Sequence, residues 1–342
     1  MRVAVITGVG EVEIREDAQP TPGPGDIAIE VGACGICTME RRLFSGTQQI
    51  YPVAPGHEVA GRVVAVGSEV DDLPGSPRIG DAVTVDLLTR CGTCSACRRG
   101  RSALCKRPQG GALSDGTLAF GAGLAEFVVA PATSAFATGD APMNQASMGE
   151  PLACVVHSVR LSGFRSGDRV AVFGGGYMGR LHLALTRHLG SPAVGVIDVS
   201  AQRLDEATEA GADWVATPDD LADRAGGSDI VFVTAGVAGA VEAALDLCDD
   251  GGTVVLYGAF PKDVLASVGA DRIHHHELNL IGVYSQEPED WRTAAGLIAS
   301  GSLAADLDRL VTARYDLASV GDALRHATTE PVYRVLVGDA EQ

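Results

Sequence analysis

The chain has 342 residues, which is enough for two domains that each bury their own core. Hydrophobic residues make up 46% and charged residues 20%, and no run of about 18 uninterrupted apolar residues is present, so the sequence holds no candidate membrane span. The formal net charge of −18, from 44 acidic and 26 basic residues, makes a surface that repels phosphate backbones and anionic lipid. We therefore expect neither nucleic-acid nor membrane partners.

The N-terminal part of the chain has the pattern of a compact, irregular β-domain. Short runs rich in Val and Ile alternate there with clusters of Gly, Pro and Asp, which favour turns. The predicted strands are Val3–Thr7, Ile27–Val31, Val59–Val66, Ala82–Leu87 and Glu126–Ala130.

Beyond about Pro151 apolar strands alternate with helical stretches. The predicted strands are Val170–Phe173, Val194–Asp198, Ile230–Thr234, Thr253–Tyr257 and Leu280–Tyr284. The predicted helices between them lie near Tyr177–Leu189, Ala201–Ala210 and Gly239–Cys248. This alternation predicts right-handed crossovers and a parallel sheet. The C-terminal stretch is expected to form helices near Trp291–Ser300 and Leu317–Ala327 and a terminal strand near Tyr333–Val337.

Four cysteines lie close together in the first half, at Cys91, Cys94, Cys97 and Cys105. This spacing suits a structural zinc ion in a closed tetrahedral site. The alternative is a pair of disulfides, which belong to oxidising compartments. Nothing at the N-terminus resembles a signal peptide, so we expect a cytoplasmic protein and a zinc site instead.

A glycine motif follows the strand Val170–Phe173. It reads Gly174-Gly-Gly176-Tyr177-Met178-Gly179 and opens a helix. In a dinucleotide site the first glycine permits the tight turn, the second lets the backbone approach a pyrophosphate, and the third allows close helix packing. The start of the helix, at Tyr177 and Met178, supplies free N–H groups and a positive dipole for the phosphates.

Three further residues complete the predicted coenzyme site. Asp198 ends the next strand, 19 positions after Gly179, where its carboxylate would accept hydrogen bonds from the adenosine ribose. The same charge would repel a 2′-phosphate, so NAD(H) is favoured over NADP(H), with Arg203 lining the adenosine edge. Thr234, after the fourth strand, is expected at the point where the strand order reverses.

A second set of metal-binding residue types precedes and follows the cysteine cluster. Cys37 follows a predicted strand, and His57 and Glu58 enter another strand twenty positions later. Glu150 adds a carboxylate at the junction of the two halves. A catalytic zinc typically has three protein ligands and an open position, which these residues would provide. Cys34 with Cys37 could also form a redox pair, but no thioredoxin-like unit surrounds it.

These motifs together resemble the zinc-containing medium-chain dehydrogenase/reductase family over essentially the whole chain. The segment Glu150-Pro-Leu-Ala-Cys-Val-Val-His157 is similar to the branch that includes sorbitol and related polyol dehydrogenases. The resemblance implies an α/β fold with a GroES-like β-rich catalytic domain and a Rossmann coenzyme domain with a doubly wound parallel sheet. The implied domains are residues 1–153, with a zinc lobe at 91–105, then the coenzyme domain at 154–287, and residues 288–342, which return to the catalytic domain.

The same resemblance implies two zinc ions per chain and NAD(H). Cys37, His57 and Glu58 would hold the catalytic zinc, with Glu150 bound directly or through water. Here the chain departs from the family, because Met39 occupies the position of the hydroxyl residue that usually relays the alcohol proton. Thr38 is one residue early for that role, and Glu40 is expected to keep the structural role of the family's usual Asp.

We therefore expect reversible hydride transfer between NAD and a secondary alcohol, such as a polyol, cyclitol or secondary-metabolite intermediate. Met39 leaves open a reductase of an imine, iminium or conjugated C=C bond, which needs no such relay. A third reading is a non-catalytic nucleotide sensor, which retention of the candidate zinc ligands disfavours. The tract His274–His276 is expected to cap a helix rather than to bind metal, and pairing at the last sheet strand predicts a homodimer or homotetramer.

Overall fold

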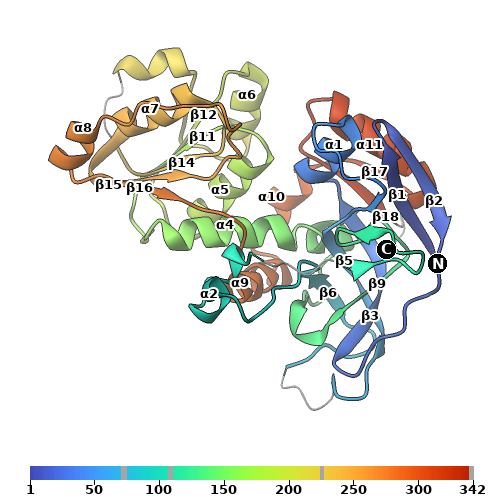
Figure 1. Cartoon of the computed structure of the whole chain (residues 1–342). Coiled ribbons are helices and arrows are strands. Elements are labelled where there is room, and N and C mark those ends of the chain that lie inside the picture. Colours follow the sequence, from blue (N-terminus) through green and yellow to red (C-terminus); the bar gives the residue numbers. More distant parts are fainter. Residues whose placement is uncertain (71–74, 107–110, 224–226, 339–342) are drawn as a thin grey trace. The chain divides into compact units, whose positions relative to one another are not determined.

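The computed structural model describes residues 1–70, 75–106, 111–223 and 227–338 (Figure 1). By its internal contacts the chain divides into two units, one formed by Met1–Ala153 and Gln286–Gln342 and the other by Cys154–Ser285. The sequence placed the second boundary after residue 287. It falls two residues earlier because the side chains of Gln286 and Glu287 bond to residues of the first unit.

The larger sheet of the first unit is built around strand β3 (Asp26–Gly35). Strands β5 (Glu58–Val66), β9 (Phe127–Pro131) and β18 (Arg334–Gly338) all pair with it in antiparallel fashion. The outer strands are β6 (Ala82–Val85), β10 (Ala135–Ala137) and β17 (Val311–Tyr315). The C-terminal segment therefore completes a sheet that the N-terminal segment begins, as the resemblance implied.

A second sheet of this unit has the order β2-β1-β4-β8-β7. Its strands are β1 (Arg2–Gly8), β2 (Glu11–Glu16), β4 (Val53–Ala54), β7 (Gly111–Ala112) and β8 (Leu118–Ala119). The helices are α1 (Thr38–Ser45), α2 (Ser95–Arg98), α3 (Met143–Ala146), α9 (Pro288–Ala299), α10 (Ala304–Asp308) and α11 (Val320–Thr329). Branched side chains on β3, such as Ile27 and Ile29, are fully buried in the core that these elements share.

The second unit is a parallel sheet with helices, as the alternating pattern predicted. Its strand order is β13-β12-β11-β14-β15-β16. The chain first adds strands on one side of β11 and then, from β14 on, on the other side, while all the strands stay parallel. The strands are β11 (Val170–Phe173), β12 (Val194–Ile197), β13 (Trp214–Ala216), β14 (Ser228–Val233), β15 (Cys248–Leu256) and β16 (Asn279–Gly282). The helices are α5 (Tyr177–His188), α6 (Ala201–Glu209), α7 (Ala238–Leu247) and α8 (Ala270–His275). Helix α4 (Gly149–Leu161) contains the first crossing between the units.

Two local expectations can be compared directly. His274 and His275 lie in the last turn of α8 and His276 is its C-cap, which confirms the capping role. The helix predicted from Leu317 begins instead with a 3-10 turn, and α11 starts at Val320. The turn forms because the Asp316 carboxylate accepts the backbone N–H of Ser319 at 2.8 Å.

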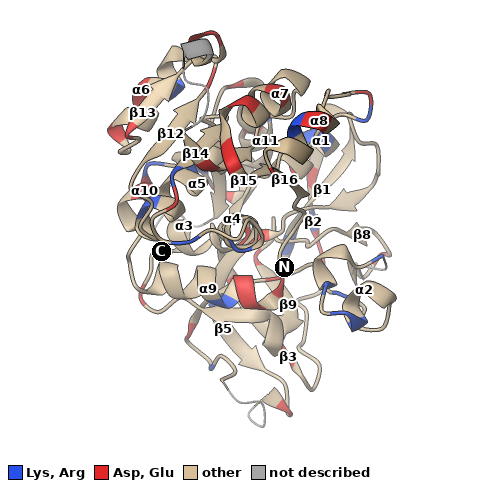
Figure 2. Cartoon of the chain, turned by 90° about the vertical axis from the view of Figure 1, so that its left-hand side faces the viewer, with Lys and Arg blue, Asp and Glu red and all other residues tan. Residues whose placement is uncertain are grey.

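The distribution of charged residues agrees with the acidic composition. Asp and Glu occur in both units (Figure 2), in keeping with the net charge of −18. In the part of the chain that the structure describes, every helix is too short or too polar to cross a membrane.

Candidate metal and coenzyme sites

The four cysteines of the lobe lie together, as their spacing predicted. We call Cys91–Cys105, with α2 and the 3-10 turn Ser102–Leu104, the cysteine lobe. Its sulfur atoms are 3.5 Å apart for Cys94 and Cys97, 3.5 Å for Cys91 and Cys105, and 4.0 Å for Cys91 and Cys97. A tetrahedral zinc with bonds of about 2.3 Å requires separations of about 3.8 Å. None of the four described cysteines forms a disulfide, and these distances fit zinc.

The backbone of the lobe prepares its sulfur atoms for a cation. The N–H groups of Cys91 and Cys94 donate to neighbouring sulfur atoms at 3.4 Å. Backbone N–H donors, first that of Cys97 and then that of Lys106, lower the pKa of Cys94 to about 6. Burial raises the pKa of Cys97 to about 12. The thiolate is the form that binds metal, so Cys94 is in that form near neutral pH, whereas Cys97 has to lose its proton when a metal binds.

The second cluster is centred on His57. Its ligand atom lies within 4.8 Å of those of Glu58 and Glu150, and also within 4.8 Å of those of Cys37 and Glu40. Cys37 is the N-cap of α1, His57 immediately precedes β5, Glu58 is the first residue of β5, and Glu150 lies in the first turn of α4. The structure thus brings Cys37 on the one hand, and Glu58 with Glu150 on the other, to ligand distance from His57. That these residues bind a metal stays a prediction.

Glu40 has more than the structural role that the sequence indicated. Its carboxylate accepts the backbone N–H groups of Cys37 at 3.0 Å and Gly56 at 3.1 Å, and lies 2.9 Å from Nδ1 of His57. Burial opposes charge on His57, but Glu40 outweighs it and raises the pKa of the imidazole well above its usual value. Because an ionised carboxylate only accepts, Nδ1 carries the proton and Nε2 is the atom left for a metal.

Glu58 forms a buried ion pair that the sequence did not reveal. Its Oε1 lies 3.0 Å from Nη2 of Arg334, whose Nη1 donates to the carbonyl of Ile36 at 2.6 Å. Burial raises the pKa of Glu58 to about 7, although Arg334 lowers it. The other oxygen, Oε2, is buried and accepts no hydrogen bond from the described residues. A cation bound by Cys37 and His57 would satisfy this oxygen, so the donor set fits zinc.

Space for the Glu58 carboxylate depends on a glycine of β3. A Cβ atom at Gly35 would lie 2.2 Å from Oε2 of Glu58. Gly35 and Glu58 are direct partners in the β3–β5 register, so the pairing brings this backbone against the carboxylate. Any larger residue would displace the candidate ligand.

Asp86 and Gln286 are neighbours of this cluster that sequence reasoning missed. Val85 pairs with Val59 in the antiparallel β5–β6 register, so Asp86 continues toward the position opposite Glu58. Burial raises the pKa of Asp86 to about 6, with Arg90 opposing the shift. The strand pattern of Ala82–Leu87 could have indicated this position, but the contact of Gln286 with Glu150 (3.2 Å) has no local signal.

The residues after Cys37 follow the sequence prediction. Thr38 is exposed, whereas Met39 is partly buried and packs against the apolar core. The position of the usual relay hydroxyl is therefore occupied by an apolar side chain.

The glycine motif of the second unit has the strand–turn–helix geometry of a dinucleotide site. Gly174 has a φ of +106°, and a Cβ there would lie 2.5 Å from Oγ1 of Thr234. A Cβ at Gly179 would lie 1.8 Å from the carbonyl oxygen of Gly174, so glycine alone permits the close packing of α5. Gly176 is the N-cap of α5, which begins at Tyr177 and Met178.

Asp198 lies beside this turn. Its two oxygens accept the backbone N–H groups of Gly175 at 2.7 Å and Ser200 at 2.9 Å. Arg203 is close, with Nη1 at 3.7 Å from Oδ2 of Asp198. Thr234 donates to the carbonyl of Phe173 at 2.8 Å, which places it where β11 and β14 diverge. The structure thus gathers the predicted coenzyme residues at one end of the sheet, where their binding of a coenzyme stays a prediction.

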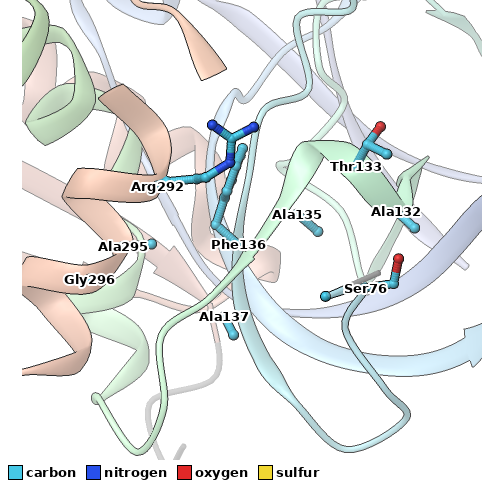
Figure 3. Close-up of a pocket in the computed structure, with 10 residues that line it drawn as sticks. Ser76, Ala132, Thr133, Ala135, Phe136, Ala137, Arg292, Ala295 and Gly296 are labelled. Atoms are coloured by element: carbon cyan, nitrogen blue, oxygen red, sulfur yellow. The ribbon is translucent and has the colours of Figure 1, made fainter. Parts of the chain in front are cut away.

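A hollow of about 380 Å³ lies elsewhere in the first unit (Figure 3). It is lined mainly by small residues and by Phe136, and Arg292 is the one titratable residue among those that line it. Phe136 stacks on Trp291, with ring centroids 5.5 Å apart. None of the lining residues belongs to the metal clusters, so this hollow lacks the groups that the chemistry requires.

Comparison with known families matches both parts of the chain. Residues 23–140 match the family described as "Alcohol dehydrogenase GroES-like domain", and residues 178–300 match the family described as "Zinc-binding dehydrogenase".

Individual relatives span nearly the same length. The chain is 32% identical to a D-altritol 5-dehydrogenase of Agrobacterium fabrum over 87% of both sequences. It is 32% identical to an L-threonine 3-dehydrogenase of Thermococcus kodakarensis, over 89% of this chain and 87% of the relative. A solved structure from Sinorhizobium meliloti, described as a zinc-binding dehydrogenase bound to NADP, has a TM-score of 0.88 and 32% identity over 99% of both chains.

Proposed function

Because the chain belongs to the zinc-containing alcohol and polyol dehydrogenases of the medium-chain dehydrogenase/reductase family, we propose that it catalyses reversible hydride transfer between a secondary alcohol and NAD. The observation that carries this proposal is the convergence of Cys37, Glu58 and Glu150 on His57. The second unit in addition has a glycine-rich turn that is suited to a dinucleotide.

Cys37, His57 and Glu58 would hold the catalytic zinc, with Glu150 bound directly or through water. Bound there, zinc acts as a Lewis acid that lowers the pKa of an alcohol oxygen. Glu40 orients His57, and Arg334 keeps Glu58 close to the other ligands.

The alcohol proton needs an acceptor other than a hydroxyl at Met39. Glu58 and Glu150 are the candidates, since both lie at the centre. Bound water or the substrate itself could complete the path.

The coenzyme would bind at the turn formed by Gly174, Gly176 and Gly179, with its pyrophosphate at the start of α5. Asp198 supports the choice of NAD over NADP, because its carboxylate lies beside the turn and would repel a 2′-phosphate. The related S. meliloti structure holds NADP, so the preference has to be measured. Bound coenzyme would accept the hydride at C4 of the nicotinamide, for which the protein must align the two carbon atoms.

The substrate we propose is a secondary alcohol of a polyol, cyclitol or secondary-metabolite intermediate. Two relatives are a D-altritol 5-dehydrogenase and an L-threonine 3-dehydrogenase, which supports this class. We also propose that the unit formed by Met1–Ala153 and Gln286–Gln342 is the catalytic domain and that Cys154–Ser285 is the coenzyme domain. We further propose a cytoplasmic location and a homodimer or homotetramer. Strand β16 supports the assembly, because it is an edge strand of the described sheet and Tyr284 beside it is 72% exposed.

The rival readings have less support. The named relatives are dehydrogenases and give no support to a reductase of imines or conjugated C=C bonds. A nucleotide sensor would have no use for an open metal site.

A panel of secondary alcohols tests the proposal. Zinc-loaded protein is mixed with NAD⁺ and each polyol, cyclitol or β-hydroxy amino acid, and NADH formation is recorded at 340 nm, the absorbance of reduced nicotinamide. We expect turnover with at least one member and none after the catalytic zinc is removed. Tight NADH binding without turnover of any alcohol or carbonyl would favour the sensor instead.

A further inference from the structure

Glu287 connects the cysteine lobe to the start of α9. Its carboxylate accepts the backbone N–H groups of Ser102 at 3.0 Å and Ala103 at 2.8 Å, and it also accepts the hydroxyl of Ser102. Glu287 is at the same time the N-cap of α9, in a reciprocal capping box with Asp290. The side chain is only 7% exposed. A capping box needs one acceptor at the N-cap, so the three bonds to the lobe are additional to capping.

The residue before Glu287 contacts the candidate catalytic centre. Gln286 is 1% exposed, and its Nε2 donates to Oε1 of Glu150 at 3.2 Å. Glu150 is in turn one of the four residues at ligand distance from His57. Two consecutive residues therefore contact two different places in the first unit: Gln286 bonds to Glu150 beside His57, and Glu287 bonds to Ser102 and Ala103 of the cysteine lobe.

The bond between Gln286 and Glu150 also has a particular place in the chain. Glu150 lies just before the first crossing between the units, after Ala153, and Gln286 lies just after the second crossing, at Ser285. The backbone at this second crossing is constrained, since Ser285 has a φ of +61°. The position of Gln286 thus depends on the contacts of the next residue, Glu287. Those contacts include three hydrogen bonds to the cysteine lobe.

We propose that Glu287 is a positioning residue that couples the cysteine lobe to the catalytic zinc centre. By anchoring α9 to the turn at Ser102 and Ala103, it sets Gln286 against Glu150 and fixes the orientation of that carboxylate toward His57. The folded, metal-filled lobe then strengthens zinc binding at the catalytic site, although its own site is closed and touches no substrate. This inference rests on the proposed function, because it assumes a zinc ion at Cys37, His57 and Glu58.

The test is the affinity of each zinc in Glu287→Gln. The full chain is loaded with two zinc ions, and zinc is withdrawn by titration with a chelator while the metal remaining per chain is measured. The zinc that is absent from Cys37→Ala identifies the catalytic one. Loss of an outer-shell partner of a metal ligand typically weakens binding about 10- to 100-fold. Glu287 acts on such a partner, Gln286, and is not one itself, so we expect Glu287→Gln to weaken the catalytic zinc by about three- to tenfold, with the lobe zinc retained.

Glu289→Gln is the matched control. Glu289 is an exposed carboxylate in the same first turn of α9, so its removal changes the helix charge equally without touching the lobe bonds. We expect both zinc affinities of this variant to match the wild type. If Glu287→Gln does not fold, Ser102→Ala removes one of the lobe bonds and should weaken the catalytic zinc in the same direction by a smaller factor.

The outcomes separate this inference from the proposed function. Two zinc ions in the wild type, with the catalytic zinc equally tight in Glu287→Gln and Glu289→Gln, would overturn the coupling and leave the function standing. Equal weakening of both zinc ions would also overturn it, since that result indicates general loosening. A wild type that binds zinc only in the lobe would overturn both.

Discussion

The carboxylate of Glu40 lies 2.9 Å from Nδ1 of His57, and both side chains are almost completely buried. This contact fixes which imidazole nitrogen can face a metal. It also explains why the run after Cys37 keeps an acidic residue although the adjacent relay hydroxyl is replaced by Met39.

Glu40→Gln should weaken the catalytic zinc about 10- to 100-fold, because the amide supports the Nδ1–H tautomer less strongly than a carboxylate does. The lobe zinc should be unaffected. The measurement is zinc per chain during chelator titration, with Glu30→Gln, an exposed carboxylate on β3, as the control. Unchanged affinity in Glu40→Gln would show that the His57 contact does not support a metal ligand.

Arg334→Leu should destabilise the zinc-free protein by about 3–5 kcal/mol, the usual result of leaving one partner of a buried ion pair alone. Arg334 and Glu58 are 6% and 1% exposed, so water cannot replace the missing cation. Urea unfolding measures the change, and Arg314→Leu on the exposed face of β17 is the control. If Arg334→Leu is no less stable than Arg314→Leu, the pair contributes nothing in the absence of zinc.

His182 should make the stability of the protein depend on pH. Burial lowers its pKa to about 4, although the carbonyl of Met178 opposes this shift. In the unfolded chain the histidine has a pKa of about 6.5. Between about pH 6.5 and 4 the imidazole is therefore protonated in the unfolded chain and neutral in the folded chain. Stability is therefore complete above pH 6.5 and falls as the pH decreases, by a total of about 3 kcal/mol near pH 4.

The check is the difference in unfolding free energy between wild type and His182→Gln from pH 4 to 8. The difference should be constant above pH 7 and should shift against the wild type below pH 6.5. His188→Gln, at the exposed end of the same helix, should show no such change. A parallel pH profile for wild type and His182→Gln would mean that folding does not shift the pKa of this imidazole.

Asp198→Asn should shift coenzyme preference toward NADP. Charge-assisted hydrogen bonds are worth about 1.5–3 kcal/mol, so loss of the carboxylate should lower kcat/KM for NAD about 10- to 100-fold. Efficiency with NADP should fall less or rise, because the repulsion of a 2′-phosphate is removed while Arg203 remains. Asp205→Asn, exposed on α6, is the control. An unchanged NAD-to-NADP ratio would remove Asp198 from the selection of the coenzyme.

The parts of the sites that could be predicted from sequence are those whose residues are local. The spacing of Cys91–Cys105 places four thiols within one short lobe, and the turn at Gly174–Gly179 requires glycine for its own geometry. The sheet of the second unit followed from strand–helix alternation for the same reason, since each βαβ connection is determined over a short stretch. The ligand roles of His57, Glu58 and the distant Glu150 were predicted from the resemblance of their motifs to the family, because no local geometry connects these residues.

The contacts that sequence reasoning missed join distant segments. Glu287 bonds to a residue 185 positions away, and Arg334 donates to a carbonyl 298 positions away. Neither side chain lies in a motif, because its role depends on how α9 and β18 pack in the folded unit. Gln286 and Glu287 are buried polar residues next to the boundary between the two units, which marks them as structurally important. This burial cannot be read from the sequence, so the two residues were not predicted.

The central claim is that Cys37, His57, Glu58 and Glu150 form a catalytic zinc centre distinct from the lobe. Zinc content per chain, measured on protein purified without chelator, tests it most directly when wild type is compared with Cys37→Ala. We predict two zinc ions in the wild type and one in the variant, with NADH formation lost in parallel. One zinc in both proteins would mean that only the cysteine lobe is filled, and would contradict the assignment of the centre.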